Sequence, residues 1–165
     1  TLGFDGGNLV GLWMTGQKYF GDTVKGEMRP NDDLPVFQQT KAWLDRYFNR
    51  EKPEISELPL APAGGEFRQA VWRILCEIPY GQVMTYGKIA EKIARRRGLK
   101  RMSAQAVGGA VGHNPISLII PCHRVVGVDG SLTGYSGGLD KKIKLLEFEG
   151  VDMSKLYRPK KGTAL

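Results

Sequence analysis

The sequence is poor in cysteine, in histidine and in long apolar runs. Its 165 residues include two cysteines, Cys76 and Cys122, and two histidines, His113 and His123. Two cysteines do not make a disulfide framework, and with the histidines they show no zinc-ligand spacing. No apolar run approaches the roughly 20 residues of a membrane span, and no signal-peptide pattern opens the chain. We therefore expect a cytoplasmic, reduced protein with no membrane partner, no metal and no other cofactor.

Charge is weighted towards the positive sign. The chain has 24 lysines and arginines against 17 aspartates and glutamates, a net charge of +7 at pH 7. This surplus favours an anionic partner, nucleic acid first and an anionic membrane surface second. With 41% hydrophobic residues, the chain can bury the core of one or two small domains.

The first half of the sequence predicts a hairpin followed by a helix. The turn Asp5-Gly6-Gly7-Asn8 lies between segments 1–4 and 8–14, a pattern typical of two antiparallel strands. Because the first strand already begins at Thr1, we expect that an upstream strand is missing. One apolar face at helical spacing predicts a helix over residues 36–48. The residues on that face are Val36, Gln39, Thr40, Trp43, Leu44, Tyr47 and Phe48.

A segment rich in proline and glycine separates this half from the rest. Residues 59–65 read Pro-Leu-Ala-Pro-Ala-Gly-Gly, which is typical of a linker. We therefore predict an N-terminal domain over residues 1–62 and a C-terminal domain over residues 63–165.

The C-terminal part predicts three helices in the order of a helix-turn-helix. The first covers residues 67–78, with Cys76 as a structural residue in its middle. Thr85 and Ser103 are the expected N-caps of the second and third helices. Between those helices, residues 95–101 carry five cations, a run that fits either a solvated face or a phosphate contact. This order suits DNA binding.

The motif that points most directly to chemistry is Pro121-Cys122-His123-Arg124. It follows the apolar run 116–120, which predicts a buried strand. A thiol becomes a nucleophile as its thiolate, and a neighbouring imidazole can take the proton. Consecutive residues of an extended chain point to opposite faces, so we expect a water between His123 and the sulfur. An isolated Cys-His pair is more often core than catalytic, but the glycines that follow favour a ligand site.

Six short motifs then carry a resemblance. They are Tyr86-Gly87-Lys88-Ile89-Ala90, Ala106-Val107-Gly108-Gly109-Ala110, Asn114-Pro115, Pro121-Cys122-His123-Arg124-Val125-Val126, Gly134-Tyr135-Ser136-Gly137-Gly138-Leu139 and Glu149-Gly150. In this register the chain resembles the O6-alkylguanine–DNA alkyltransferases, also called methylated-DNA–protein-cysteine methyltransferases. The resemblance implies an α+β fold, with a small ribonuclease-H-like α/β domain before a winged helix-turn-helix domain that carries the reactive cysteine.

The resemblance also implies the roles of individual residues. Cys122 would accept the alkyl group, His123 would act as base through a water, and Glu149 would orient the imidazole. Asn114 would tie the helix-turn-helix to this network, and Tyr86 would contact the flipped base. The base pocket would be formed by Val111, Val125, Tyr135, Ser136 and Lys142. The DNA contacts would come from Ser103, Gln105, Ala106, Gly108 and Gly109, and we add Arg96, Arg97 and Lys100 from the basic run.

The implied partner is double-stranded DNA that contains O6-alkylguanine, with O4-alkylthymine left open. The product would be a thioether that water cannot reverse, so one monomer would repair one base. One position departs from the family's pattern, since Gln105 stands where an arginine commonly fills the place of the extruded base. Glutamine keeps hydrogen-bonding capacity but lacks the planar cation.

Other interpretations of the same residues stay open. The chain could be a lesion-binding module without transfer, a cysteine hydrolase or a regulator that uses the helix-turn-helix alone. A lesion-binding module of this kind would lack the cysteine, and a hydrolase would need an oxyanion hole. Without the resemblance, Tyr86 would be a core residue and Glu149 a solvated helix end. His113 has no predicted partner and is expected at the surface.

Overall fold

A computed structural model of the chain describes residues 1–31 and 33–160. The chain forms helices and short strands, in keeping with the predicted α+β class. The strands are β1 (Leu2–Asp5), β2 (Asn8–Leu12), β3 (Met84–Thr85) and β4 (Val125–Val126). The α-helices are α1 (Pro35–Phe48), α2 (Glu66–Cys76), α3 (Tyr86–Arg96), α4 (Ala104–Gly112) and α5 (Leu139–Phe148). Short 3-10 helices are η1 (Ile55–Glu57), η2 (Cys122–Arg124) and η3 (Met153–Lys155).

The predicted hairpin is present at the start of the chain. Strands β1 and β2 pair antiparallel, and Gly6 and Gly7 both take positive φ in the turn between them. Glycine is favoured there because other residues clash in that conformation. A second glycine, Gly11, has no room for a side chain, since an added Cβ would lie 1.9 Å from the Trp13 ring.

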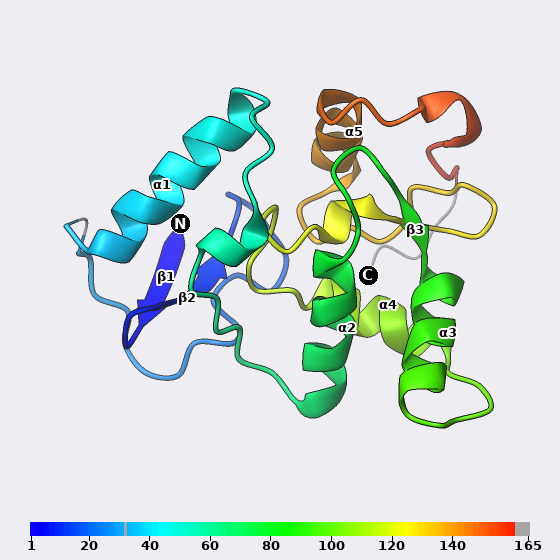
Figure 1. Cartoon of the computed structure of the whole chain (residues 1–165), viewed down its shortest axis with the longest axis horizontal. Helices are drawn as coiled ribbons and strands as arrows, with labels where there is room; N and C mark the ends of the chain where they lie inside the picture. Colours follow the sequence, from blue (N-terminus) through cyan, green and yellow to red (C-terminus); the bar gives the residue numbers. More distant parts are fainter. Residues whose placement is uncertain (32, 161–165) are drawn as a thin grey trace.

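Helix α1 lies beside this hairpin at one end of the molecule (Figure 1). Pro35 occupies its first turn, where its missing N–H costs no helical hydrogen bond. The predicted inner face is largely correct, since Val36, Thr40, Trp43 and Tyr47 are buried. Phe48, which was assigned to the same face, is 54% exposed.

Helices α2, α3 and α4 gather at the opposite end, as Figure 1 shows. Both predicted N-caps are correct: Thr85 Oγ1 accepts from the Lys88 N–H, and Ser103 Oγ accepts from the Ala106 N–H. These side chains satisfy donors that a helix start leaves free. The indole N–H of Trp72 on α2 donates to the Ala110 carbonyl on α4 at 2.9 Å and holds the two helices together.

The predicted strand over residues 116–120 is wrong. Within residues 1–31 and 33–160, Ile116 is the one member of this run that forms a β-bridge, a parallel one to Leu12, and Leu118 has a φ of 71°. The run bonds within itself, since the Ile120 N–H donates to the Ile116 carbonyl at 3.0 Å. The Asn114 side chain adds to this, because it accepts from the Ile116 N–H and donates to the Ile120 carbonyl. These bonds close the run into a buried turn. An apolar run alone does not distinguish that turn from a strand.

Two smaller expectations also need correction. Helix α2 ends at Cys76, so this cysteine lies at the helix end and not in the middle. His113 has partners, since its ring stacks on Tyr19 with centroids 4.0 Å apart and its Nδ1 lies 2.7 Å from the Gly109 carbonyl oxygen. The proposed domain boundary between residues 62 and 63 stays a prediction.

Candidate active site around Cys122

Cys122 opens the 3-10 helix η2, directly after the buried turn. Its side chain is 1% exposed. The Asn114 amide donates to its Sγ at 3.1 Å, the same amide that donates to the Ile120 carbonyl. Burial raises the pKa of the Cys122 thiol, and the Asn114 hydrogen bond and the Lys142 charge oppose that rise. The resting sulfur is therefore a neutral thiol with groups already in place that favour the thiolate.

His123 is completely buried beside it, with one ring nitrogen engaged. Its Nε2 lies 2.8 Å from Glu149 Oε1. Its Nδ1 is buried and has no hydrogen-bond partner among the described residues. Burial lowers the pKa of His123, and the contact with Glu149 acts in the opposite direction. The imidazole is thus neutral at rest and has one nitrogen free to take a proton.

The reason that His123 does not lie against the sulfur differs from the one we expected. The two residues belong to a 3-10 turn and not to an extended strand. Within that turn His123 is directed towards Glu149, the residue that follows α5. The expected opposition of neighbouring side chains across a strand is therefore the wrong argument. The described residues nevertheless show no hydrogen bond between the His123 ring and the Cys122 sulfur.

Glu149 is held on both of its oxygens. Arg124 donates to it through Nε at 2.8 Å and through a terminal nitrogen at 2.9 Å, a bidentate pair. The Gly81 N–H adds a longer bond of 3.3 Å. Burial opposes ionisation of this carboxylate, but the bonds from His123 and Arg124 outweigh it and lower the pKa of Glu149 to about 2. Glu149 is therefore a carboxylate that can hold an imidazolium without taking its proton.

The predicted pocket residues are all buried. Val111 lies on the buried side of α4, Val125 lies in β4, and Tyr135 and Ser136 lie in the glycine-rich loop of residues 132–138 that precedes α5. The Ser136 hydroxyl is buried without a hydrogen-bond partner in the described part of the chain. The orphaned Ser136 hydroxyl and the free His123 nitrogen are polar groups that a bound molecule could satisfy.

Lys142 is a fully buried cation on α5. Its ammonium donates to the Val125 carbonyl at 2.6 Å and to the Thr133 carbonyl at 2.9 Å. Burial lowers its pKa to about 8, and the Cys122 thiolate acts against that change. Lys142 thus ties the glycine-rich loop to β4 and places positive charge near the sulfur.

Tyr86 begins α3 and reaches the same loop. Its hydroxyl donates to the carbonyls of Thr133 and Gly134 at 3.2 and 3.1 Å. Burial raises the pKa of this phenol well above its usual value. Tyr86 is therefore a protonated donor at the edge of the loop, and it packs against the core without being fully buried.

The residues of α4 and its N-cap that were predicted to contact DNA differ in their exposure to solvent. Ser103, Gln105 and Ala106 are exposed on its first turn, whereas Gly108 is buried. An added Cβ at Gly109 would meet nothing within 4 Å, so this stretch of the helix is open. A flat surface of this kind allows close approach of another backbone.

The basic run is less free than its sequence suggests. Arg96 pairs with Glu77 at 2.6 Å and Arg97 pairs with Glu66 at 3.1 Å, both carboxylates at the ends of α2. Lys100 has no such partner among residues 1–31 and 33–160, and with Arg95 and Arg101 it lines a groove between α3 and the start of α4. The unpaired charge therefore lies beside the open face of α4.

Two neighbours of the site were missed by sequence reasoning. Tyr47 of α1 donates to Glu149 Oε1 at 2.6 Å across 102 residues of sequence. The segment after β2 also contacts the site, since the Lys18 N–H donates to the Ser136 carbonyl of the glycine-rich loop and Gln17 accepts from Ser117 in the turn before Cys122. Helical spacing did place Tyr47 on the buried face, but spacing names no partner across that distance.

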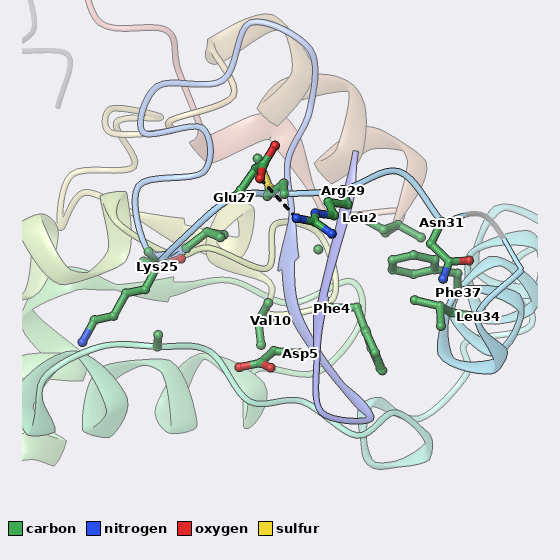
Figure 2. Close-up of a pocket in the computed structure, with 15 residues that line it drawn as sticks. Leu2, Phe4, Asp5, Val10, Lys25, Glu27, Arg29, Asn31, Leu34 and Phe37 are labelled. Atoms are coloured by element: carbon green, nitrogen blue, oxygen red, sulfur yellow. Dashed lines mark ion pairs between the residues drawn. The ribbon is translucent and has the colours of Figure 1, made fainter.

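A cavity of about 640 Å³ in the N-terminal half is separate from this site. It lies between the hairpin, residues 23–31 and the start of α1, with Leu2, Phe4 and Phe37 among its apolar residues (Figure 2). None of the residues of the six motifs that carry the resemblance lines it. Among the described residues no cluster of histidine, cysteine, aspartate or glutamate could hold a metal ion. Within the same residues, each helix is too short or too polar to cross a bilayer.

Comparison with known families identifies both halves. Residues 5–62 match the family described as "6-O-methylguanine DNA methyltransferase, ribonuclease-like domain", and residues 66–151 match "6-O-methylguanine DNA methyltransferase, DNA binding domain". The methylated-DNA–protein-cysteine methyltransferase of Haemophilus influenzae is 46% identical over 136 residues, covering 79% of this chain and 73% of the relative. The Mycobacterium bovis protein of the same name is 41% identical over 149 residues, covering 90% and 84%.

Solved structures agree with these matches. The crystal structure of Mycobacterium tuberculosis OGT in complex with DNA superposes with a TM-score of 0.75 at 40% identity, covering 90% of this chain and 84% of the other. An O6-methylguanine DNA methyltransferase from Methanococcus jannaschii gives 0.64 at 33% identity, covering 98% and 94%. The fold and the buried thiol thus define a DNA-binding transferase of DNA repair. The chain belongs to the 6-O-methylguanine DNA methyltransferases, as the motifs predicted.

Proposed function

We propose that Cys122 is the alkyl acceptor and that its substrate is O6-alkylguanine flipped out of double-stranded DNA. The observation that supports this most directly is the sulfur itself, which receives a hydrogen bond from Asn114 and adjoins a histidine held by Glu149. A soft thiolate suits attack on the saturated carbon of the alkyl group. A cysteine with a structural role alone would not explain why a buried histidine beside it has one ring nitrogen without a hydrogen bond.

The proton leaves the thiol through His123. A water between Cys122 Sγ and the free Nδ1 would carry it, while Glu149 keeps Nε2 engaged. The new bond joins sulfur to the alkyl carbon, and the bond from that carbon to guanine O6 breaks. The leaving guanine then takes up one proton, for which we propose the Tyr86 hydroxyl as the donor. The product is a thioether, so each molecule acts once.

The base itself would be held by main-chain groups around the sulfur. The carbonyls of Cys122 and Val125 would accept from its exocyclic amine, and the Ser136 N–H would face O6. Val111 and Tyr135 would line the sides, with the Lys142 charge behind the thiolate. Since Cys122 and Ser136 are both buried, entry of a base requires the glycine-rich loop to move.

Helix α4 would lie against the DNA. Its exposed first turn presents Ser103, Gln105 and Ala106, and the flat surface at Gly109 permits a close backbone. Gln105 would take the place of the extruded base through hydrogen bonds alone. We place this reaction in the cytoplasm, because a free reactive thiol persists in a reducing compartment. The protein would act as a monomer, which suits a search of DNA by short excursions.

The test is the mass of the intact protein after incubation with a duplex that holds one O6-methylguanine. With excess duplex, the wild-type protein should gain one methyl group per molecule and no more. With substoichiometric duplex, the methylated fraction should equal the amount of lesion. Cys122→Ser should bind the duplex and gain nothing.

Two other outcomes would contradict the proposal. Tight lesion binding by the wild type without a mass change would indicate a recognition module. Repeated turnover, with more lesions repaired than protein molecules present, would indicate a hydrolytic reaction and not a stoichiometric one.

A further inference from the structure

We infer that Tyr47, in the N-terminal half, is a positioning residue of the transfer reaction, and that through Glu149 its hydroxyl sets the proton affinity of His123. This rests on the proposed role of His123 as the base for Cys122. Neither the motifs nor the family matches single out Tyr47. The inference comes from one contact, a 2.6 Å hydrogen bond from the Tyr47 hydroxyl to Glu149 Oε1.

The Tyr47 hydroxyl donates to the same Glu149 oxygen, Oε1, that contacts the proposed base His123. Glu149 Oε1 accepts from three donors: His123 Nε2, an Arg124 terminal nitrogen and the Tyr47 hydroxyl. Each additional donor withdraws electron density from a carboxylate oxygen and makes it a poorer acceptor for the others. Tyr47 therefore weakens the hold of Glu149 on a protonated His123. It also keeps the proton of the imidazolium from moving onto the carboxylate.

The position of the hydroxyl is fixed by packing. Tyr47 is 1% exposed. Its ring stacks on Trp43 at 5.7 Å and meets Tyr80 and Phe148 edge-on or tilted at 5.8 and 5.7 Å. Helix α1 supplies Trp43, and α5 supplies Phe148. An aromatic cage drawn from both halves of the chain thus aims one phenol at one oxygen.

Other charges reach the same pair and must be held constant in any test. Arg124 belongs to the element of His123, Lys142 lies on α5, and Tyr80 follows α2. Beyond the cage, Arg50 lies over the Phe148 ring and Lys52 over the Tyr80 ring. The groups that face His123 or Glu149 are Tyr47, Tyr80, Cys122, Arg124, Tyr135 and Lys142.

The sign of the effect follows from the geometry. Tyr47→Phe removes one donor from Glu149 Oε1 and leaves the ring in its cage. The oxygen becomes a better acceptor for His123 Nε2–H, so the imidazolium is stabilised and the pKa of His123 rises. His123 then becomes protonated at a higher pH than in the wild type. In that state it can no longer accept the proton of the Cys122 thiol.

The experiment measures the single-turnover rate constant of methyl transfer from an O6-methylguanine duplex across the pH range in which the protein stays folded. The acid limb is the part of the pH–rate profile in which the rate constant falls as pH falls and His123 becomes protonated. In Tyr47→Phe this limb should move to higher pH by on the order of one unit, the scale of one hydrogen bond to a charged group. The affinity for the lesion duplex, measured in a Cys122→Ser background, should not change. An unmoved acid limb would overturn the inference.

A matched control separates this effect from general disturbance of α1. Thr40→Val also removes a buried hydroxyl from the same helix, one that donates to the Val36 carbonyl of that helix and not to the site. Its acid limb should coincide with that of the wild type. If Thr40→Val moves the limb as far as Tyr47→Phe does, the effect belongs to the helix and the inference fails.

A variant of opposite sign covers the case in which Tyr47→Phe folds poorly. Replacement of Tyr47 by 3-fluorotyrosine makes the phenol a stronger donor, so the acid limb should move to lower pH. An upward or absent shift would contradict the inference. Absence of methyl transfer by the wild type itself would refute the proposed function, whereas normal transfer with unmoved limbs would refute the role of Tyr47 alone.

A direct reading of His123 is also accessible, because the chain has two histidines. Labelling the imidazole carbons gives two signals, and His113→Gln assigns them. The His123 signal should titrate at higher pH in Tyr47→Phe than in the wild type. Identical titration in the two proteins would contradict the inference independently of any kinetics.

Discussion

At the scale of single residues, the Asn114 side-chain amide both stabilises the turn before Cys122 and binds the Cys122 sulfur. Its oxygen accepts from the Ile116 N–H, and its nitrogen donates to the Ile120 carbonyl and to Cys122 Sγ. The first two bonds fold the turn that carries Cys122, and the third favours the thiolate. The construction of the turn and the activation of the nucleophile are therefore inseparable at this position.

Two substitutions at Asn114 separate the donor from the acceptor. Asn114→Ala loses these bonds and a longer one of 3.4 Å to the Ile116 carbonyl, and should lower the free energy of unfolding by about 1–3 kcal/mol, the cost of unsatisfied buried groups. Asn114→Asp keeps the acceptor for Ile116 but places negative charge against the sulfur. The rate of methyl transfer should fall in the order wild type, Ala, Asp, as measured by single-turnover kinetics with urea unfolding beside it. An aspartate variant as active as the wild type would show that the bond to sulfur is unimportant.

Asn114 also shows which parts of the site can be predicted from local sequence and which cannot. The Cys122-His123 pair and Glu149 could be singled out from motifs, and the structure places them together. The strand predicted over residues 116–120 failed because a side chain, Asn114, supplies hydrogen bonds that a neighbouring strand would otherwise supply. Tyr47 was recognised as buried but not as a donor to Glu149, since periodicity fixes a face and says nothing of a contact 102 residues away.

At the scale of elements, the helix-turn-helix was the most predictable part. Its helices begin at caps that depend on neighbouring residues, Thr85 and Ser103, and both behave as expected. The basic run between α3 and α4 was harder to interpret. Sequence counts its charges, but the acids that pair with Arg96 and Arg97 come from α2 and become neighbours only in the folded chain.

The pairing predicts which cations of the run meet DNA. Lys100→Ala and Arg101→Ala should each weaken duplex binding and reduce the slope of log affinity against log salt by about 0.9, the value for one phosphate contact. Arg96→Ala and Arg97→Ala should change that slope less, because their charge is already shared with Glu77 and Glu66. Fluorescence anisotropy over a salt series measures the slopes. Equal slopes for the two pairs of variants would contradict this division.

At the scale of the whole molecule, Glu149 joins three separate parts of the chain. It receives bonds from Tyr47 of α1, from Gly81 after α2 and from His123 and Arg124 of η2. A single carboxylate thus connects the N-terminal half to the helix-turn-helix half at the point where the chemistry is proposed. Loss of its charge should loosen both halves together.

That connection predicts how stability depends on pH. The pKa of Glu149 is about 2 in the folded protein, below its usual value, so its contribution is complete above the unfolded value of about 4.3 and is lost as pH falls towards 2. His123, whose pKa burial lowers, acts in the same direction below about 6.5. The free energy of unfolding in urea should therefore fall with acidification. The difference in free energy of unfolding between the wild type and Glu149→Gln should become smaller as pH falls from about 4.3 towards 2. A difference that does not change with pH would contradict the assignment of this low pKa to Glu149.

The measurement that tests the central claim most directly is the location of the transferred methyl group. The chain's two cysteines fall on separate tryptic peptides, Cys122 on 102–124 and Cys76 on 74–88. After reaction with an O6-methylguanine duplex, peptide 102–124 should carry one methyl group, assigned to Cys122 by fragmentation. Methylation of peptide 74–88, or of neither peptide while the lesion is repaired, would show that the buried thiol beside His123 is not the acceptor.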